Sequence, residues 1–500
     1  MKAPRQKLWR KILFWFALFL LLLVALAARP TLHIVRALWN DCDDIVATLP
    51  PGTANDASRL NETKIHEVWR IPSDRLLAES QLADLLQRAR TNHLKVSIAG
   101  ARHSMGAHTI ADGGIVVDML PFNRMELDAP QKILRVQAGA RWREVIRFLN
   151  AQGLSVEIMQ SNDDFTVGGS LSVNCHGWQF NRPPIASSVE SLRLMRADGT
   201  VAICSRTENR ELFSLALGGY GLVGIILDVK LRVVSNERYQ MQRTTVATKD
   251  FATTLAAQSG DTNIAMVYGR LNVAAEGFLS EGIINILRRQ PNEATLVTEF
   301  RPRKLTKLKR AIFRGSVGSD YGKRLRWRAE QTLDPLISGD VFERNALLSD
   351  SATWFENRCT NATDILMECF VPPAQFEPFL AELRQIIPRN KADLLNLTVR
   401  HVNQDQDSFL GYADREMFAL VMLFHQSRDA ASEARMKTTA QEIIAAALAH
   451  EGRYYLPYRS HATAEQFARA YPQAGQFFTL RQKYDPEGLF ENGFSRSYGK

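Results

Sequence analysis

The chain is poor in cysteine, and this scarcity limits the kinds of site it can build. Its 500 residues include 5 cysteines, and no two of them stand in a CxxC pattern. Neither a zinc site nor a disulfide framework is therefore expected, and no metal centre is predicted. Cys359 and Cys369 can pair in an oxidising compartment, but two separate buried thiols are the preferred interpretation.

Several sequence signatures are also missing. The chain has no low-complexity tract, no P-loop pattern and no recognisable nucleic-acid-binding module, so a nucleic acid is not an expected partner. The apolar content is 45%. At roughly 100–200 residues per domain, a chain of this length and composition has room for two large folded units.

Charge is absent from residues 12–28, which form a continuous apolar run. The basic residues that precede this run are Lys2, Arg5, Lys7, Arg10 and Lys11. The run is longer than the usual signal-peptide core of about 7–15 residues and reaches the short end of a membrane span, about 17 residues. An uncleaved membrane anchor within residues 1–30 is expected, although residues 25–27 also fit a signal cleavage site. The basic cluster would keep the N-terminus in the cytoplasm and place the folded domains on the outer, periplasmic side.

Acidic residues are nearly absent between Arg301 and Arg328, where Asp320 faces many lysines and arginines. Interleaved apolar residues such as Leu308 and Phe313 are typical of a segment that binds an anionic membrane surface. A solvated basic helix explains the same composition. Both interpretations stay open.

The most distinctive pattern is a glycine-containing stretch over residues 95–119. Short β-branched runs bounded by glycine predict a strand, a loop and a second strand. The loop contains Gly100 and Gly106, with His103 between them. Because the backbone N–H groups of such a loop can point toward one place, it can hold a pyrophosphate. Taken alone, the pattern also fits an ordinary strand, turn and strand with a polar histidine.

A second stretch, residues 159–177, is rich in small residues. Gly168 and Gly169 permit close approach of the backbone to a flat ligand. The hydroxyl groups that can bond the polar edge of such a ligand belong to Ser161, Thr166 and Ser172. A tight loop before a helix is the simpler alternative.

A third stretch places Gly219, Gly221 and Gly224 in the spacing of the dinucleotide-binding fingerprint. That fingerprint requires a strand before it and a helix after it. Here residues 210–217 are helix-like, and residues 225–234 have the β-branched composition of a strand. The match is therefore rejected.

The remaining periodicities favour an α+β fold over a doubly wound one. In the N-terminal half, helices are predicted over residues 73–90, capped by Ser73 or Ser80, and 142–152, and strands over 133–138, 188–195 and 200–205, the last two as a hairpin. In the C-terminal half, strands are predicted over residues 362–371, 394–402 and 417–424, and amphipathic helices over 376–387 and 432–450. Their alternation predicts a mixed sheet covered on one face.

These stretches resemble the FAD-dependent oxidoreductases of the vanillyl-alcohol oxidase type, which have a PCMH-type FAD-binding domain. The segments that carry the resemblance are Gly100-Ala-Arg-His-Ser with Gly114-Ile-Val-Val-Asp-Met, Thr166-Val-Gly-Gly-Ser-Leu-Ser-Val-Asn-Cys-His-Gly, Gly218-Gly-Tyr-Gly-Leu-Val-Gly-Ile-Ile and Lys483-Tyr-Asp-Pro-Glu-Gly-Leu-Phe-Glu-Asn. The resemblance implies a FAD-binding domain over residues 56–235 and a substrate (cap) domain over residues 236–482. It also implies that residues 483–500 return to the first domain.

The resemblance further implies which residues contact FAD. They are Gly100, Ala101, Arg102, His103, Ser104, Met105, Ser161, Thr166, Gly168, Gly169, Ser172, His176, Gly224 and Ile225. In sugar-lactone oxidases, alditol oxidases and cytokinin dehydrogenases, the histidine at the position of His103 is bonded covalently to the flavin, so a covalent link is expected. Arg102 stands where those families usually carry glycine. Residues 166–224 look equally like decaprenylphosphoryl-ribose oxidase, whose own loop lacks the histidine.

The expected substrate site surrounds Arg400, in a segment that resembles the Glu-Ile-Arg strand of aldonolactone and alditol oxidases. Thr398 stands where that strand carries its glutamate, and Tyr458 or His461 takes the place of a lysine of those enzymes. Oxidation of an alcohol by flavin needs a base for the hydroxyl proton. Arg400, Tyr458 and His461 are the expected catalytic residues.

The expected activity is FAD-dependent oxidation of a C–OH group in a sugar, a sugar lactone or a polyol, as in D-arabinono-1,4-lactone oxidase, with oxygen or quinone as the electron acceptor. Two alternatives stay open. One is a dehydrogenase for a lipid-linked sugar or another membrane lipid that passes electrons to quinone. The other is a flavin-binding protein without catalysis, which the departures at Thr398 and Tyr458 permit.

Overall fold

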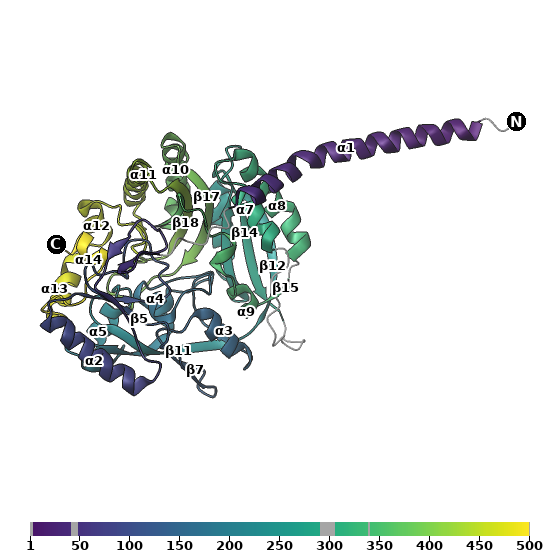
Figure 1. Cartoon of the computed structure of the whole chain (residues 1–500). Coiled ribbons are helices and arrows are strands. Elements are labelled where there is room, and N and C mark those ends of the chain that lie inside the picture. The colour runs from purple at the N-terminus through teal and green to yellow at the C-terminus, as the bar shows by residue number, and fades with distance from the viewer. Residues whose placement is uncertain (1–3, 42–48, 291–305, 339–340, 500) are drawn as a thin grey trace.

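The computed structural model describes residues 4–41, 49–290, 306–338 and 341–499. The helices are α1 (Pro4–Asn40), α2 (Arg75–Thr91), α3 (Trp142–Asn150), α4 (Val167–Ser172), α5 (Arg210–Ala216), η1 (Ile185–Ser188), η2 (Thr248–Asp250), α6 (Phe251–Ala256), α7 (Thr306–Arg314), α8 (Asp320–Ser338), α9 (Arg344–Leu348), η3 (Ala352–Trp354), η4 (Pro373–Gln375), α10 (Phe376–Arg389), α11 (Ala430–Ala449), α12 (Ala464–Ala470), α13 (Ala474–Tyr484) and α14 (Gly493–Tyr498). The strands are β1 (Thr53–Ala54), β2 (Thr63–Lys64), β3 (Glu67–Arg70), β4 (Val96–Ala99), β5 (Ile115–Asp118), β6 (Met125–Asp128), β7 (Ile133–Gln137), β8 (Leu154–Val156), β9 (Val189–Met195), β10 (Val201–Ser205), β11 (Ile225–Ser235), β12 (Arg238–Ala247), β13 (Ile264–Leu271), β14 (Glu281–Arg289), β15 (Val341–Glu343), β16 (Ala362–Val371), β17 (Asp393–Val402), β18 (Met417–Ser427) and β19 (Arg453–Tyr454). They form the expected α+β fold of two domains (Figure 1).

The stretch that contains His103 joins two strands of a small parallel sheet. Strands β3 and β4 both pair with the central strand β5 in parallel. Parallel neighbours need a crossover connection rather than a tight turn, and residues 100–114 provide it. The histidine loop, residues 100–114, therefore begins where β4 ends.

Helix α2 lies close to its predicted position, but its cap differs from the prediction. Neither Ser73 nor Ser80 opens it. The Asp74 carboxylate accepts hydrogen bonds from the backbone N–H groups of Leu76 and Leu77, both at 3.1 Å. A carboxylate at this position also interacts favourably with the positive end of the helix dipole.

A six-stranded antiparallel sheet completes the first domain. Its strands follow the order β10-β9-β11-β7-β6, and β8 pairs with the end of β11. The predicted hairpin is confirmed as β9 and β10, with Gly199 in the turn at φ +84°. Helix α5 precedes the Gly219 stretch and β11 follows it, which confirms that this is not a dinucleotide-binding fingerprint.

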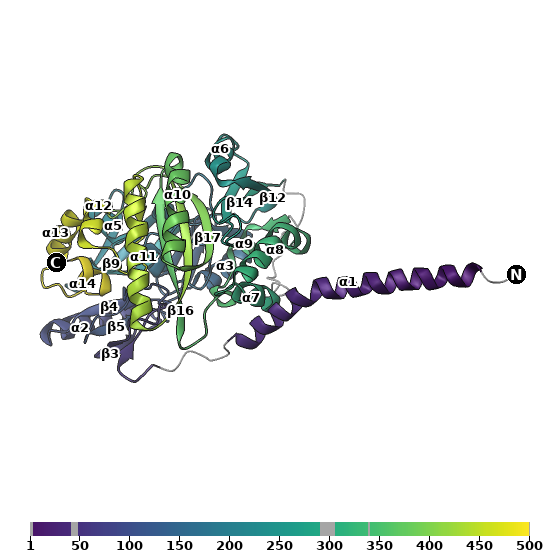
Figure 2. The same ribbon diagram turned by 90° about the horizontal axis from the view of Figure 1, so that it is seen from above.

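The second domain is built on an eight-stranded sheet in the order β15-β12-β14-β13-β17-β18-β16-β19. All of these pairings are antiparallel, so the prediction of a mixed sheet is wrong. The predicted strands and helices are present, but the chain runs β16, α10, β17, β18, α11, β19. Because β18 returns between β16 and β17, it separates two strands that would otherwise pair in parallel. Helices α10 and α11 lie side by side across one face of this half of the sheet (Figure 2).

The C-terminal residues lie against the first domain. Phe490 forms a bridge with Val96 of β4, and the backbone N–H of Glu491 donates to the Val96 carbonyl at 3.0 Å. The N–H of Gly493 donates to the carbonyl of Ala107 at 2.8 Å. This segment therefore contacts both the strand before the histidine loop and the loop itself.

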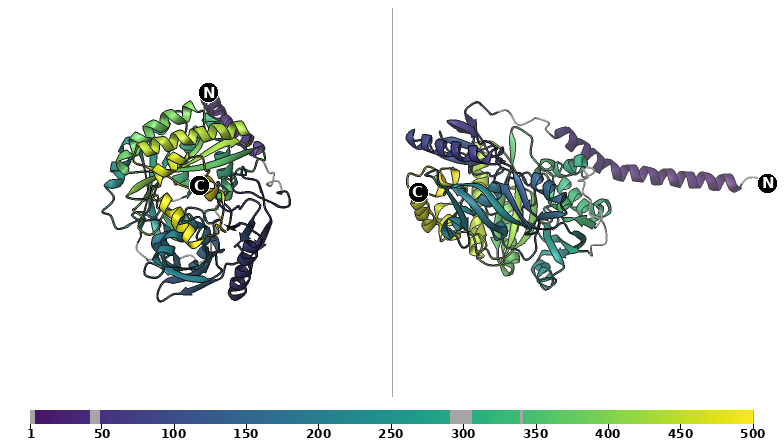
Figure 3. Two further views of the ribbon diagram at one scale, coloured as in Figure 1. Left: turned by 90° about the vertical axis from the view of Figure 1, so that its left-hand side faces the viewer. Right: turned by 90° about the horizontal axis from the view of Figure 1, so that it is seen from below.

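Helix α1 projects away from the two domains (Figure 3). Its C-terminal part is attached to them, because His33 Nε2 lies 2.8 Å from the Gly315 carbonyl oxygen and Asp41 forms a 2.5 Å ion pair with Arg310. Within the described residues, no helix is both long and apolar enough to cross a membrane. The expected anchor over residues 12–28 thus gains no support from the structure, and the side chains of the candidate cleavage site at 25–27 lie partly outside the description.

The basic segment beyond residue 300 is partly turned inward. Arg301, Arg303 and Lys304 lie outside the described residues. Ion pairs within the protein join Arg310 to Asp41, Arg314 to Asp364, Lys323 to Asp393 and Arg326 to Glu330. Because these four cations pair with protein carboxylates, they contribute neither to a membrane patch nor to a solvated face.

The two cysteines considered as a pair differ from the prediction of two separate buried thiols. Cys369 is a free, buried thiol in β16. Cys359 is half-buried in the loop before that strand and is disulfide-bonded. The two are therefore not bonded to each other.

Candidate functional site

A cavity lies between the two domains, and the sheet face that α10 and α11 leave uncovered forms one of its walls. The residues of this wall alternate along their strands, as expected for side chains on one face of a sheet. They are Arg270 of β13, Leu366 and Glu368 of β16, Asn396, Thr398 and Arg400 of β17, and Val421 and Leu423 of β18. The opposite wall comes from the first domain, chiefly from residues 100–104, 160–173 and 220–226.

The strand register arranges this wall in rows. Thr398 pairs with Val421, and Val421 pairs with Glu368 on the far side of β18. Glu368 therefore lies in the same row as Thr398, two strands away. The next row, Asn396, Leu423 and Leu366, is mostly apolar.

The loop that begins at Gly100 presents its backbone to the cavity. Within the described part of the chain, the backbone N–H groups of residues 101–104 donate no hydrogen bond. Arg102 adopts a left-handed conformation at φ +57°. Successive unpaired N–H groups around a left-handed residue form an anion-binding nest, which fits the pyrophosphate expected here.

Gly100 brings this loop close to α4. A Cβ at Gly100 would lie 2.1 Å from Thr166 Oγ1. That oxygen caps α4 by accepting a hydrogen bond from the N–H of Gly169 at 3.2 Å. Gly168 and Gly169, for which a tight loop was the simpler alternative, lie in this short helix. Glycine is required at position 168 because a Cβ there would lie 2.7 Å from the Cβ of Ala138.

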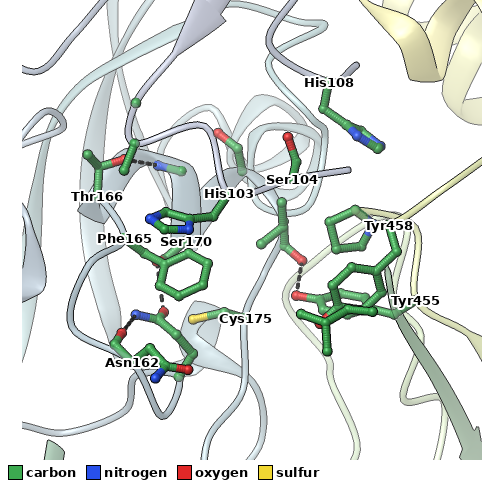
Figure 4. Close-up of a pocket in the computed structure, with 18 of the residues that line it drawn as sticks. His103, Ser104, His108, Asn162, Phe165, Thr166, Ser170, Cys175, Tyr455 and Tyr458 are labelled. Carbon is green, nitrogen blue, oxygen red and sulfur yellow. Dashed lines mark hydrogen bonds between the residues drawn. The ribbon is translucent and has the colours of Figure 1, made fainter. Parts of the chain in front are cut away.

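His103 lies at the edge of the cavity with its ring 4.5 Å from that of Phe165, between centroids. Burial, followed by repulsion from Arg141 and Arg143, lowers the pKa of His103 to about 4. The imidazole is therefore neutral at physiological pH. Figure 4 shows His103 and Phe165 on one side of the cavity, with Cys175 below Phe165, and Tyr455 and Tyr458 on the other side.

Glu368 is a buried carboxylate at the centre of the cavity wall, with 2% of its surface exposed. Its Oε1 lies 2.6 Å from Nε2 of His176, which is also buried, and its Oε2 accepts a hydrogen bond from the Tyr458 hydroxyl at 3.3 Å. Burial by itself raises the pKa of Glu368, but His176, then Arg400 and Tyr458, outweigh this effect and hold the pKa below its ordinary value. The carboxyl group is therefore ionised at neutral pH.

Arg400 connects the two walls. Its Nη1 donates to the carbonyl of His176 at 3.2 Å, and its Nη2 donates to Ser161 Oγ at 3.0 Å. Its buried Nε has no hydrogen-bond partner within the described residues. Arg400 also lines the cavity, so an unsatisfied hydrogen-bond donor lies in this wall.

The structure brings most of the predicted site residues together. Those that line the cavity are Gly100, Ala101, Arg102, His103, Ser104, Ser161, Thr166, Gly168, Gly169, Ser172, His176, Gly224, Ile225, Arg400 and Tyr458. Their individual roles stay predictions.

Two predicted residues do not line the cavity. Met105 is buried behind it, where its backbone N–H donates to the Pro457 carbonyl at 2.9 Å. The Nε2 of His461 lies 2.8 Å from Glu433 Oε1, and burial lowers the pKa of His461. His461 is therefore not placed to receive a substrate proton.

The sequence predictions missed Glu368, although a signal was present. This residue is one of two carboxylates, with Asp364, inside the mainly apolar run Ala362–Val371, which was predicted to be a strand. A charge in a buried strand is expensive unless it is paired, so its presence indicates a specific use. The sequence alone offered no means of finding its partner His176, which is far away in the chain.

Two known families match separate parts of the chain. Residues 77–205 match the family described as "FAD binding domain". Residues 316–498 match the family described as "D-arabinono-1,4-lactone oxidase". Between them, the matched regions cover well over half of the chain and contribute to both walls of the cavity.

Individual relatives include enzymes named for sugar lactones and one named for cytokinin. The chain is 32% identical over 155 residues to L-gulonolactone oxidase of Mus musculus, an alignment that covers 31% of this chain and 35% of the mouse protein. It is 33% identical over 171 residues to the mitochondrial L-galactono-1,4-lactone dehydrogenase 2 of Oryza sativa subsp. japonica, covering 34% of this chain and 29% of that protein. It is 27% identical over 224 residues to cytokinin dehydrogenase 2 of Arabidopsis thaliana, covering 44% of each. In all three comparisons the chain spans less than half of the relative's length.

The close approach at Gly100 is testable. We expect Gly100→Ala to displace Thr166 or the loop, since the added Cβ would lie 2.1 Å from Thr166 Oγ1, and so to lower the amount of FAD bound per chain at least several-fold. The measurement is flavin absorbance relative to protein after gel filtration. Gly475→Ala is the matched control, because its Cβ would meet nothing within 4 Å, and it should retain full FAD content. Equal FAD content in the two variants would contradict the packing described.

Proposed function

We propose that this chain, which belongs to the FAD-binding oxidoreductases of the D-arabinono-lactone oxidase family, oxidises a C–OH group of a sugar lactone. The observation that carries the proposal is the cavity itself, where an anion-binding loop faces the polar row of Glu368 and Thr398 together with Arg400. When bound, FAD supplies the two-electron acceptor for this oxidation. The protein supplies binding, orientation and a place for the proton.

The first domain has groups that suit FAD. The unpaired N–H groups of residues 101–104 suit the pyrophosphate, and the small residues of α4 permit close approach of the backbone to a flat ring. Positive charge from Arg141 and Arg143, which lowers the pKa of His103, also favours a dianionic group nearby. Both walls thus offer what the cofactor and a polyhydroxy substrate require.

The second domain orients the substrate. The free Nε–H of Arg400 suits a ring or carbonyl oxygen of a lactone, and its two other contacts fix the guanidinium in place. Burial raises the pKa of Tyr458 well above its ordinary value, so the phenol stays protonated and acts as a donor. These groups favour a small, oxygen-rich substrate at this end of the cavity.

The proposal predicts reduction of the flavin by lactones. We expect at least one of D-arabinono-1,4-lactone, L-gulono-1,4-lactone and L-galactono-1,4-lactone to bleach the bound flavin under anaerobic conditions. Arg400→Met should raise the apparent dissociation constant of that lactone at least about tenfold, since it removes a charged hydrogen-bond donor. Failure of all three lactones, followed in a stopped-flow instrument, would rule out the proposed activity.

We propose in addition that His103 forms the covalent link to the flavin expected from the resemblance. The support is chemical: the ring lies at the cavity edge, is neutral because its pKa is about 4, and makes no hydrogen bond within the described residues. A neutral imidazole nitrogen with a free lone pair is the nucleophilic form.

Acid precipitation tests this link. We expect the wild-type pellet to stay yellow and its denatured mass to include FAD, whereas His103→Ala should release all flavin into the supernatant. His108→Gln serves as the control, because His108 lines the same cavity and burial likewise lowers its pKa to about 4. Acid-stable flavin in His103→Ala would show that another residue holds it.

A second candidate function is oxidation of a sugar carried on a lipid, with quinone as the electron acceptor. One observation favours it: the far end of the cavity is apolar, with Phe313, Trp354 and Phe355 facing Leu366 and Leu423. The C-terminal end of α1 is joined to this region. Asp41, the residue after the helix, pairs with Arg310, and Arg310 also donates to the carbonyl of Thr353. In a panel that adds lipid-linked sugars in vesicles, reduction by these alone would select this candidate over free lactones.

We also propose that α1 attaches the protein to a membrane and that the domains lie on its outer side. Large apolar side chains of α1 are exposed, including Phe14 and Trp15 at 63% and Leu21 at 69%. The disulfide at Cys359 is consistent with an oxidising compartment. We expect the full-length chain to remain in the membrane pellet after alkaline carbonate extraction, and release into the supernatant would refute the attachment.

A further inference from the structure

We propose that Glu368 accepts the hydroxyl proton of the substrate, with His176 and Tyr458 positioning its two carboxylate oxygens. This role rests on the proposed function, because it names the base that the oxidation of a C–OH group needs. The segment around Arg400 has Thr398 where the strand that it resembles carries a glutamate. In this proposal the missing carboxylate is supplied by Glu368 of the nearby strand β16.

The register of the sheet supports this assignment. Glu368 and Thr398 occupy one row, with only Val421 of the intervening strand between them. Neighbouring strands are about 4.8 Å apart, so a substrate ring held at Arg400 and Thr398 spans the distance to Glu368. A carboxylate at position 368 therefore reaches the same region of the cavity as a carboxylate at position 398 would.

The hydrogen bonds of Glu368 leave room for a proton. Its Oε1 is bonded to His176, whereas the one hydrogen bond that its Oε2 receives from the described residues is the long 3.3 Å bond from Tyr458. A carboxylate oxygen has two lone pairs, and Oε2 therefore keeps acceptor capacity on the cavity side. His461, the base considered from the sequence, has its Nε2 beside Glu433 and does not line the cavity.

The groups around Glu368 keep it in the basic form. His176 faces it from the segment after α4, Arg400 from β17, and Tyr455 and Tyr458 from the segment after β19, with Tyr412 and Tyr471 completing the shell. The net effect of burial and of these partners is a pKa below the ordinary value for glutamate. The carboxylate is thus ready to accept a proton at neutral pH without a change of its partners.

The carbinol C–H and O–H bonds break and a C=O bond forms, so the alcohol is oxidised by two electrons. The hydrogen of the C–H bond leaves with both electrons to FAD, the oxidant of the proposed function, and the O–H proton passes to Glu368 Oε2.

The test compares Glu368→Gln with Glu433→Gln, a matched glutamate that bonds a histidine away from the cavity. With the lactone that reduces the wild-type flavin fastest, we expect Glu368→Gln to slow reduction at least about 100-fold, the usual minimum for loss of a general base. The dissociation constant of the lactone, taken from the flavin difference spectrum, should change less than threefold. Glu433→Gln should leave both values near wild type.

The pH profile gives a second readout that a structural role would not move. A carboxylate base with a lowered pKa is ionised above that pKa, so wild-type reduction should be independent of pH near neutrality and fall in acid. Glu368→Gln should lack this acid limb, and Glu368→Asp should retain it at an intermediate rate.

The outcomes separate the two proposals. If no lactone reduces the wild-type flavin, the proposed function fails and this role fails with it. If the wild type is reduced and Glu368→Gln stays within threefold of its rate, or keeps the acid limb, the role of Glu368 alone is overturned. Should Glu368→Gln bind no flavin, Glu368→Asp decides: an unchanged rate overturns the role, and a slowed rate with the acid limb supports it.

Discussion

The antiparallel register of β16, β18 and β17 is the constraint on which the site depends. It places Glu368 and Thr398 in one row and sets Arg400 one row beyond. Because side chains alternate across a strand, a slip of one residue in β16 would turn Glu368 toward α10 and α11 and bring Met367 to the cavity. The packing of those two helices on the opposite face opposes such a slip. The hydrophobic core of the second domain therefore determines which side chains of the sheet face the cavity.

The buried pair of Glu368 and His176 adds a second constraint. Removing one partner of a buried hydrogen bond typically costs about 1–3 kcal/mol, because the other polar group is left unsatisfied. The pair joins a strand of the second domain to a segment of the first, and Arg400 makes a parallel connection through Ser161 and the carbonyl of His176. Polar groups that line the cavity therefore also hold its two walls together.

The sequence predicted the local elements and the residues of the histidine loop well, because both depend on short-range patterns. The hairpin of β9 and β10, helix α5 with β11, and the strands and helices around Arg400 are present near their predicted positions. The mixed sheet was wrong because the place of β18 between β16 and β17 is decided by long-range pairing, which periodicity does not record. For the same reason Glu368 was missed and His461 was included, since proximity in sequence to Tyr458 does not determine which side chain turns into the cavity.

The histidine loop itself depends on the whole assembly. Arg102 holds a left-handed conformation, which costs a residue other than glycine roughly 1–2 kcal/mol, at a position where the oxidases it resembles usually carry glycine. Contacts from three distant parts of the chain hold the loop, among them Met105 N–H to the Pro457 carbonyl, Ala107 N–H to Asp56 at 2.7 Å, and the N–H of Gly493 to the Ala107 carbonyl. They come from the second domain, the start of the first domain and the C-terminal segment. Because strain of this size persists only where the surroundings fix the backbone, the anion-binding nest forms once these distant parts of the chain have packed together.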